Sequence, residues 1–362
     1  MHVAEVPATR EELGAALGAA AEAGTPVRFR GGATKIGWTR PAPPGAIELS
    51  TTGLNAIVEH NAGDLTAVLE PGVLLADAQA TFAQAGQMLA LDPPDGGATV
   101  GGVVATADTG PLRARYGGPR DLVVGMRVAL SDGTLAKSGG KVIKNVAGYD
   151  IAKLFTGSFG TLGAIVELSV RLHPLPPGTA TATGASSDAD QLASGAAALA
   201  QSALEQQGLD VRWDSGRGMV LARFAGASPR PQAEAAEVLL RREGLSTEIV
   251  DEDEPLWDEQ RAAQRGPLVV KVSGLRTRLP DLLRTAEELG ASLVGRAALG
   301  LAWLRLEEPS VAAVERLRQG WIAAVQERPA DLDVDPFGEL DPAAEALMQR
   351  VKERFDPSGV CV

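Results

Sequence analysis

The chain has 362 residues, of which 45% are hydrophobic and 22% are charged, and its formal net charge at pH 7 is −12. This length suits two domains, or one large domain with a cap, and the composition is that of a globular protein able to bury a core. An acidic chain without a basic stripe is a poor candidate for nucleic acid or an anionic membrane surface, so we expect neither as a partner.

The chain has one cysteine and three histidines, and these low numbers exclude several kinds of metal site and cross-link. The single cysteine, Cys361, excludes an intramolecular disulfide, a thiolate zinc cluster and an iron–sulfur cluster held by this chain alone. His2, His60 and His173 are too far apart in sequence to have ligand-like spacing, so no metal site is expected, although carboxylates could still hold a divalent ion. The apolar runs fall short of the ~20 residues of a membrane helix, and no signal-peptide pattern opens the chain. We therefore expect a cytoplasmic protein without an integral membrane segment, which partner subunits could bring to a membrane.

In the first half of the chain, short β-type runs alternate with glycine-rich loops. Thr9 and Glu12 have the spacing of a capping box, which predicts a helix running to about Ala23. A second helix is expected over residues 74–85. Strands are expected over residues 27–30, 67–70, 123–130 and 163–172.

A proline-rich segment predicts the main domain boundary. Pro174, Pro176 and Pro177 fall within four residues, which neither a helix interior nor a central strand tolerates. The charge also changes there, because residues 1–178 carry 14 basic and 16 acidic residues and residues 179–362 carry 20 and 30. We therefore expect one domain over residues 1–176, a second over 179–335 and a C-terminal segment over 336–362.

The second half predicts an open sheet with helices on one face. Helices are expected near residues 188–207, 229–243, 277–289 and 309–319, and strands near 209–213, 219–225, 245–250, 267–273 and 301–306. Ser228 and Thr277 are expected helix N-caps. A last helix is expected from Asp341 to Phe355.

Three glycine clusters carry the functional signal. The first, Arg30-Gly31-Gly32-Ala33-Thr34-Lys35, follows a predicted strand. Successive glycines let backbone N–H groups turn toward one anion, with Thr34 adding a hydroxyl and Arg30 or Lys35 a charge. A plain turn is the alternative interpretation of this cluster.

The second cluster is Gly96-Gly97-Ala98-Thr99-Val100-Gly101-Gly102, followed by Val103-Val104-Ala105-Thr106. Each glycine costs about 0.5–1 kcal/mol in the interior of a regular element. Close approach of the backbone to a ligand explains this cost, and a glycine-rich hairpin is the alternative.

The third cluster joins Lys144-Asn145-Val146-Ala147-Gly148-Tyr149-Asp150 to glycines at 157, 160 and 163. The glycine triplet precedes a strand, so it is not the strand–G-x-G-x-x-G–helix fingerprint of a Rossmann fold. Gly139-Gly140-Lys141-Val142 also fails as a phosphate-binding P-loop. A different nucleotide-binding fold is indicated.

Together the clusters resemble the FAD domain of the vanillyl-alcohol-oxidase and p-cresol-methylhydroxylase type of flavoprotein, over about residues 5–175. The resemblance implies an α+β fold, in which an FAD-binding domain of two α/β subdomains carries a second α+β cap domain and the C-terminal segment packs back on the FAD domain. It also implies FAD as the cofactor and a set of cofactor-binding residues: Arg30, Gly31, Gly32, Ala33, Thr34, Lys35, Thr99, Val100, Gly101, Gly102, Val104, Ala105, Thr106, Gly160, Gly163 and Ile165.

Within that family the chain is most similar to the small FAD-binding subunits of bacterial glycolate oxidase. The match lies in residues 97–102, Gly110-Pro111, Arg120-Asp121 and residues 144–150. The larger catalytic flavin subunit carries a late histidine motif, whereas no histidine follows His173 here. Relatives with covalent FAD have a histidine at the position of Thr34, so the resemblance implies non-covalent FAD.

The resemblance implies a subunit of a 2-hydroxy-acid (glycolate) dehydrogenase, with a larger catalytic flavin subunit and an iron–sulfur subunit as partners. A self-contained FAD oxidoreductase and a flavin-fold scaffold without catalysis remain the alternatives.

The sequence identifies no catalytic residue for such a reaction. A hydroxy acid needs a base and a cation. The cation candidates are Lys271, Arg276, Arg278, Arg113 and Arg115, each more simply explained as surface charge. Tyr149 or Asp150 could act as base, and Trp38 or Trp257 could line a flavin cleft, but structural roles explain these residues better.

Overall fold

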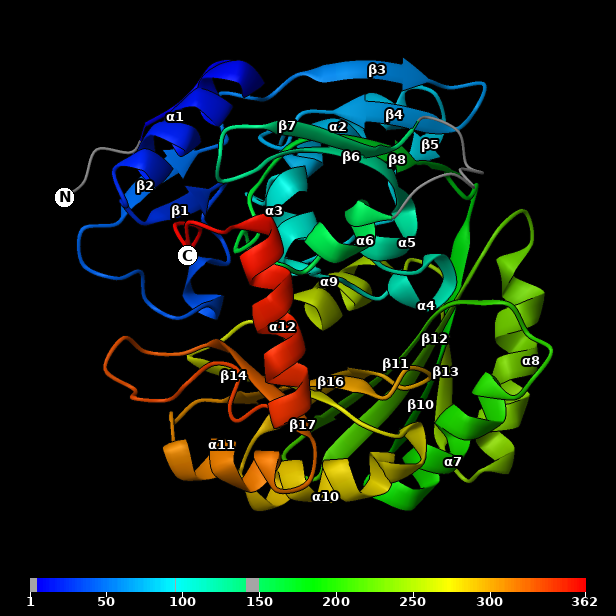
Figure 1. Cartoon of the computed structure of the whole chain (residues 1–362). Helices are drawn as coiled ribbons and strands as arrows, with labels where there is room; N and C mark the ends of the chain where they lie inside the picture. Colours follow the sequence, from blue (N-terminus) through cyan, green and yellow to red (C-terminus); the bar gives the residue numbers. More distant parts are fainter. Residues whose placement is uncertain (1–4, 95, 141–149) are drawn as a thin grey trace. The chain divides into compact units, whose positions relative to one another are not determined.

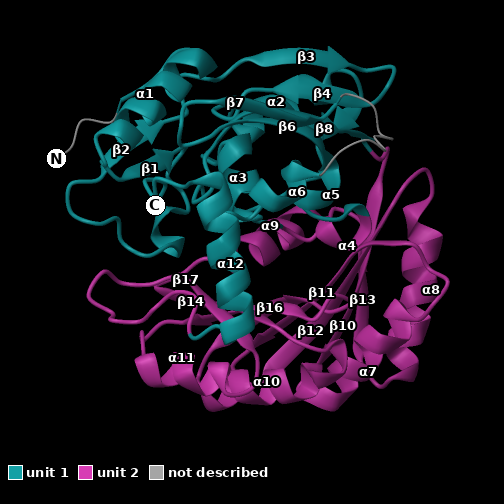
Figure 2. Cartoon of the chain, in the orientation of Figure 1, with its two compact units in different colours: residues 1–109, 116–175, 339–362 teal, residues 110–115, 176–338 magenta. Residues whose placement is uncertain are grey.

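The computed structural model describes residues 5–94, 96–140 and 150–362, and the chain divides into two compact units. Unit 1 comprises residues 1–109, 116–175 and 339–362, and unit 2 comprises residues 110–115 and 176–338 (Figure 2). The C-terminal segment therefore belongs to the same unit as the N-terminal half.

Unit 1 contains one five-stranded antiparallel sheet and two smaller sheets (Figure 1). The five strands lie in the order β3-β4-β8-β6-β7, β1 pairs with β2 in parallel, and β5 pairs with β9. Their bounds are β1 Val27–Arg30, β2 Ile47–Ser50, β3 Ile57–Asn61, β4 Thr66–Leu69, β5 Gln87–Met88, β6 Val123–Ala129, β7 Leu135–Gly139, β8 Ala164–Arg171 and β9 His173–Pro174. The four strands predicted in this half are confirmed as β1, β4, β6 and β8.

Side chains cap some of the helices of unit 1, namely those of Thr9, Thr99, Asp150 and Asp341. The helices are α1 Arg10–Glu22, η1 Ile36–Trp38, α2 Leu75–Ala83, α3 Val100–Thr106, α5 Pro119–Leu122, α6 Ile151–Phe155 and α12 Pro342–Phe355, while α4 Arg113–Tyr116 spans the unit boundary. Thr9 caps α1, since its Oγ1 accepts from the Glu12 N–H at 3.1 Å. The Glu12 carboxylate accepts from the Ala8 N–H at 2.8 Å, one residue earlier than the capping box predicts.

The C-terminal segment completes one hydrophobic core of unit 1. Leu13 and Leu17 of α1 pack with Val27 of β1 and with Val360 and Cys361. Burial raises the pKa of the Cys361 thiol to about 12, so this cysteine is a neutral core residue at neutral pH.

Unit 2 is built on an open eight-stranded sheet in the order β13-β10-β12-β11-β15-β16-β14-β17, with every neighbouring pair antiparallel. The strands are β10 Thr179–Ser186, β11 Gln206–Asp214, β12 Arg217–Ala225, β13 Ser246–Val250, β14 Leu268–Ser273, β15 Ser292–Arg296, β16 Leu301–Leu306 and β17 Ile322–Glu327. β10, β15 and β17 are absent from the sequence prediction.

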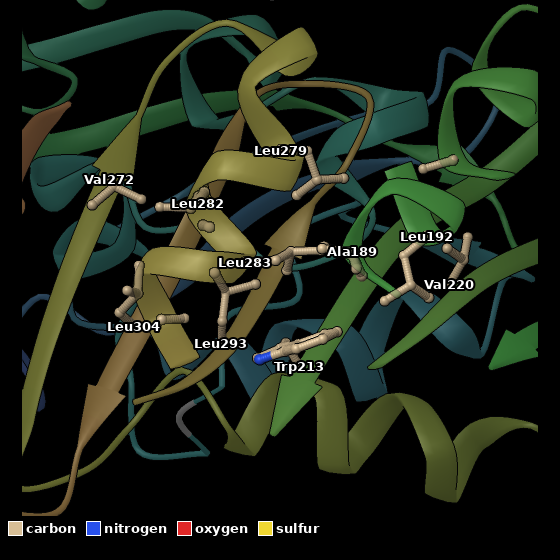
Figure 3. Packing of buried hydrophobic residues seen from close by; sticks show 14 of the residues in the cluster. Ala189, Leu192, Trp213, Val220, Val272, Leu279, Leu282, Leu283, Leu293 and Leu304 are labelled. Atoms are coloured by element: carbon tan, nitrogen blue, oxygen red, sulfur yellow. The ribbon is translucent and has the colours of Figure 1, made fainter. Parts of the chain in front are cut away.

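Four helices share one core with one face of this sheet: α7 Ala189–Ala200, α8 Pro229–Arg242, α10 Leu279–Glu288 and α11 Val311–Arg318. Leu192 of α7 and Leu283 of α10 lie among Trp213, Val220 and Leu304 of the strands (Figure 3). The predicted arrangement of helices on one face is thus confirmed for these four.

A fifth helix, α9 Glu254–Ala262, was not predicted, and it lies by the other face. There, Val269, Val294 and Trp303 form a small second core with Ala263, the residue that ends α9.

Two predicted helix caps differ from the structure. Thr277 lies inside a short 3₁₀ helix, η2 Arg276–Arg278, and α10 begins after Arg278 without a side-chain cap, so the predicted Thr277 cap is wrong. Ser228 does precede α8, but its side chain makes no capping hydrogen bond, and Pro229 supplies the fixed first turn instead. None of the helices in the described parts of the chain has the length and apolar character needed to span a bilayer.

Candidate functional site

Unit 1 contains a cavity of about 840 Å³, including its open mouth. Its walls come from β1 and the loop after it, from α3, from the loop before β8 and from a few single positions: Arg28, Phe29, Arg30, Gly31, Gly32, Ala33, Thr34, Lys35, Ile36, Thr39, Thr51, Pro71, Thr99, Gly101, Gly102, Ala105, Thr106, Phe159, Gly160, Gly163, Ala164, Ile165 and Val362.

The three glycine clusters therefore converge on one cavity. Of the residues predicted to bind a cofactor, all line it except Val100 and Val104, whose side chains are completely buried in α3. The part of the third cluster at residues 144–149 lies outside the described residues. Asp150 caps α6, accepting from the Lys153 N–H at 3.4 Å, and pairs with the Lys153 ammonium at 3.0 Å, which is a structural role.

The loop after β1 presents four successive backbone donors. The N–H groups of Gly31, Gly32, Ala33 and Thr34, here called the amide nest, donate no hydrogen bond to any residue that the structure describes. Ala33 adopts a left-handed backbone, with φ of +58°, which turns consecutive N–H groups toward a common side. Gly31 and Ala33 are half-buried and Gly32 and Thr34 are exposed, so these neighbouring N–H groups are open to a ligand, and such a group of donors is suited to hold an anion.

The glycines of the first two clusters also serve the protein's own packing. A Cβ at Gly31 would lie 2.3 Å from Thr99 Oγ1, and one at Gly32 would lie 2.1 Å from the Gly97 oxygen. Likewise a Cβ at Gly101 would lie 2.4 Å from the Cβ of Pro71. Small residues are therefore required here because two backbone segments meet beside the cavity, in addition to any need of a ligand.

The second cluster forms a helix, α3, which the sequence analysis did not predict. Thr99 caps it, accepting from the Gly102 N–H at 3.2 Å, while the Val100 and Gly101 N–H groups donate to the Val73 and Pro71 oxygens, each at 2.8 Å. The first donors of α3 are therefore already used within the protein, and the amide nest remains the donor group of the cavity.

The third wall is a turn that leads into the edge of a strand. Gly160 and Gly163 have φ of +81° and +136°, in the region that favours glycine. β8 then begins at Ala164, and its pairing with β4 covers only Leu168–Arg171. Ala164 and Ile165 line the cavity, and the edge of β8 at these two residues is not paired with β4. An unpaired strand edge offers backbone N–H and C=O groups, which can bind a flat heteroaromatic ring.

The cations around the cavity are held by the protein. Lys35 forms a buried ion pair with Asp108, 3.3 Å from Nζ to Oδ2, and its Nζ donates to Thr34 Oγ1 at 3.0 Å. Arg30 pairs with Glu48 at 2.9 Å. The Arg28 guanidinium donates to the Ile36 oxygen and, at 2.7 Å, to Thr39 Oγ1, and burial lowers its pKa below the usual value. An anion in the cavity would therefore be bound by neutral backbone N–H groups, with the buried ammonium of Lys35 close to them.

Among the described residues, His60 and His173 are not part of the cavity walls. His60 bonds to Gln87 at 3.0 Å and packs edge-on against Phe82, and the His173 ring lies 4.7 Å from that of Tyr116. Burial, with a smaller effect of Arg171, lowers the pKa of His173. Neither ring is placed to act as a base on a ligand of this cavity.

The tryptophans named from the sequence are core residues. Trp38 is buried with the Lys35 ammonium 5.8 Å from its ring, and Trp257 is buried in unit 2, where its Nε1 donates to Thr181 Oγ1 at 2.8 Å.

The predicted substrate cations belong to unit 2, where most have protein partners. Arg278 donates to the Gly320 oxygen at 2.8 Å and lies 4.9 Å from the Trp321 ring, while the Lys271 ammonium lies 5.7 Å from the Trp303 ring. Arg115 pairs with Glu205 at 2.8 Å. Arg113 is half-buried, and the exposed Arg276 borders two other cavities of unit 2.

Comparison with known proteins shows which kind of domain contains the cavity. Residues 2–139 match the family model described as FAD binding domain. The chain is 36% identical over 154 residues to the glycolate oxidase subunit GlcE of Escherichia coli (strain K12), which covers 42% of this chain and 43% of that protein. It is 36% identical over 172 residues to the glycolate oxidase subunit GlcD of Bacillus subtilis (strain 168), covering 47% and 36%. The mitochondrial D-lactate dehydrogenase [cytochrome] of Arabidopsis thaliana is 34% identical over 170 residues, covering 47% and 30%.

The matched part thus spans less than half the length of these curated relatives. Two solved structures of alkyldihydroxyacetonephosphate synthase match 98% of this chain, with TM-scores of 0.71 and 0.72 at 15% and 14% identity, and the match covers 74% and 75% of those chains. The predicted α+β fold with a second α+β domain is confirmed. The chain has the vanillyl-alcohol-oxidase-type fold, and its first 139 residues carry an FAD binding domain.

Proposed function

We propose that this chain is the FAD-binding subunit of a multi-subunit flavin dehydrogenase that oxidises a 2-hydroxy acid such as glycolate. The observation that carries the proposal is the amide nest: four N–H groups that have no acceptor among the described residues and lie at the wall of a cavity inside an FAD binding domain. A diphosphate is the anion of FAD, and backbone N–H groups of this kind are its usual partners.

The other walls fit the rest of the cofactor. The edge of Ala164 and Ile165 would hold the adenine through backbone groups, and the Gly101–Gly102 side of α3 leaves room for the cofactor to pass. Bound FAD supplies a two-electron acceptor that protein side chains cannot provide. The residues of this chain bind the cofactor, orient it and exclude water from it.

We further propose that FAD is held without a covalent bond. Thr34 lines the cavity at the position where the covalent relatives have a histidine, and its hydroxyl already accepts a hydrogen bond from Lys35. Acid precipitation of the flavin-loaded protein should therefore release all of the flavin into the supernatant, and flavin left in the pellet would refute the non-covalent mode.

Unit 2 offers little support for substrate chemistry within this chain. A 2-hydroxy acid needs a cation for its carboxylate and a base for its hydroxyl proton. Arg212, Arg223 and Arg296 of the sheet pair with Glu259, Asp253 and Asp210 of the same unit, at 3.1, 2.9 and 2.6 Å. These arginines stabilise unit 2 and are therefore not available to bind a substrate carboxylate. This favours a role of the chain in binding FAD and relaying electrons. The larger flavin subunit would then oxidise the acid, and an iron–sulfur subunit would accept the electrons.

The test is anaerobic mixing of the purified, flavin-loaded chain with glycolate and with D-lactate while flavin absorption is followed. We expect slow or absent bleaching by the chain alone, and fast bleaching once the partner subunits are added. Full reduction within about one turnover time of a typical enzyme, roughly 0.1 s, would contradict the subunit role.

One alternative function has an observation in its favour. The matching D-lactate dehydrogenase of Arabidopsis thaliana is not named as a subunit, unlike the two glycolate oxidase relatives, and this favours a self-contained FAD oxidoreductase. Fast bleaching by the isolated chain would support that alternative, whereas a purified protein that binds no flavin would support a scaffold without catalysis.

A further inference from the structure

The end of the chain forms one wall of the cofactor cavity. The Val27 N–H of β1 donates to the Val360 oxygen at 2.7 Å, and the Val362 N–H donates back to the Val27 oxygen at 2.9 Å. This parallel bridge places Val362 on the cavity wall beside β1. The family model that matches residues 2–139 does not extend to this wall.

A buried carboxylate organises this C-terminal segment. Asp356, 2% exposed, directly follows α12 and accepts from the N–H groups of Val360 at 3.2 Å and Cys361 at 2.8 Å. Burial alone would raise the pKa of Asp356, but the hydrogen bonds from Lys352 and Cys361 outweigh it and hold this pKa below the usual value. The carboxylate is therefore ionised at neutral pH and fixes the path of residues 356–361.

Lys352 connects this carboxylate to a second wall of the cavity. From the last turn of α12, its ammonium donates to the Asp356 carboxylate, to the Cys361 oxygen and, at 2.7 Å, to the Thr161 oxygen. Thr161 lies between Gly160 and Gly163, both of which line the cavity. One half-buried ammonium thus joins the turn before β8 to the C-terminal segment. Lys352 and Thr161 are 191 residues apart in the sequence.

We infer that Lys352 is a positioning residue for the cofactor cavity: it holds the turn at Gly160 and the wall at Val362 in place together with Asp356. An ammonium has three donors, and all three are used here between two segments that no covalent or strand pairing joins directly. Gly160 and Gly163 make the turn adaptable, so its shape depends on such an external contact. The inference rests on the proposed binding of FAD in this cavity.

The test compares Lys352→Met with Lys352→Arg and with Arg350→Met in the full chain. Arg350→Met removes the same charge from the same helix at an exposed position, so it is the matched control. The readouts are the Kd of the apoprotein for FAD by flavin fluorescence, thermal unfolding of the apoprotein, and amide hydrogen exchange over residues 157–163.

We expect Lys352→Met to raise the Kd for FAD about tenfold or more, because charged buried hydrogen bonds are lost. Exchange over residues 157–163 should become faster in the same variant. Lys352→Arg, which keeps a multiple donor, should stay within about threefold of the wild type, and Arg350→Met should be unchanged.

A folded Lys352→Met variant with wild-type Kd and exchange would overturn the inference, even if its unfolding temperature fell, because that result would mean a purely structural role. Should Lys352→Met not fold, Asp356→Asn, which keeps an acceptor, carries the same expectation for Kd and exchange. If the wild type binds no FAD, the proposed function fails, and the exchange over residues 157–163 alone still decides whether Lys352 orders this turn.

Discussion

Lys35 Nζ lies 3.3 Å from Asp108 Oδ2, and the two side chains are only 4% and 1% exposed. Lys35 ends the loop that carries the amide nest, and Asp108 follows α3, so this ion pair fastens two walls of the cavity to each other. The Asp108 carboxylate also accepts from the Thr109 N–H at 2.9 Å, which fixes its orientation. Lys35, which was predicted to contact the cofactor, thus fixes the position of this loop through its ion pair with Asp108.

Breaking this pair should destabilise the protein strongly. Lys35→Met removes the buried ammonium that pairs with the buried Asp108 carboxylate, and breaking a buried ion pair by removing one member costs about 3–5 kcal/mol of the free energy of unfolding. The double variant Lys35→Met/Asp108→Asn should cost clearly less, because no charge remains buried. Urea unfolding of the apoprotein measures both; a loss below about 1 kcal/mol for Lys35→Met would show that the pair contributes little.

A negative charge beside the amide nest should prevent FAD from binding. Thr34 is exposed to the cavity, so Thr34→Asp places a carboxylate where the diphosphate would lie. We expect Thr34→Asp to weaken FAD binding at least about 100-fold, or about 2.7 kcal/mol, and Thr34→Asn, which has the same shape without the charge, to weaken it less than tenfold. Flavin fluorescence titration gives both values, and equal affinities for the two variants would place the diphosphate elsewhere.

The two glycines of α3 should respond differently to alanine. At Gly101 a Cβ would meet the Pro71 Cβ at 2.4 Å and its Cα at 2.9 Å, so Gly101→Ala should lower the free energy of unfolding by about 1–3 kcal/mol. At Gly102 the nearest atom is Thr99 Oγ1 at 3.1 Å, and the better helix propensity of alanine offsets that contact by up to about 1 kcal/mol. Urea unfolding in parallel should therefore show the larger loss at Gly101, and the reverse order would contradict the packing of α3.

His173 should make the protein less stable in weak acid. Burial and the neighbouring Arg171 lower its pKa in the folded state, so the unfolded chain binds more protons below pH about 6.5. This contribution to stability is complete above that pH and is lost as the pH falls through the lower folded pKa. His173→Phe keeps a ring beside Tyr116 and cannot titrate. Urea unfolding at pH 7.5 and pH about 5.5 should show a smaller loss in the variant than in the wild type, and an equal loss would remove His173 as its cause.

Much of the fold follows from local sequence patterns. Thr9 with Glu12, and Asp341 before Pro342, mark helix starts that the structure confirms. Four strands of unit 1, β1, β4, β6 and β8, were predicted from short β-type runs between glycines, whereas β2, β3, β5, β7 and β9 were not predicted. β10, with the sequence TATATGAS, was missed because its threonines alternate only with small alanine and glycine residues and it contains no large apolar side chain, although β12 and β13 flank it on both sides. Its place in the sheet is decided by those neighbours.

The cofactor site was predictable only in part, for a related reason. The glycine clusters indicate that another group lies close to the backbone, but they do not show whether this group is a ligand or another part of the chain. At Gly101 the close neighbour is Pro71 of the chain itself. Thr51, Pro71 and Val362 also line the cavity and carry no local signal. The first two follow the ends of β2 and β4, and strand ends are a weak indication of a site. Val362 reaches the wall through pairing with β1, which no local pattern encodes.

The central claim is that the amide nest binds the diphosphate of FAD, and titration of the apoprotein with FAD and with riboflavin, which has the same ring system without phosphate or adenine, tests it most directly. Flavin fluorescence and equilibrium dialysis should give one FAD per chain, with a Kd at least about 100-fold lower than that for riboflavin, since charge-assisted bonds to four N–H groups are lost in riboflavin. Equal affinities for the two flavins, or no binding of FAD, would contradict the account.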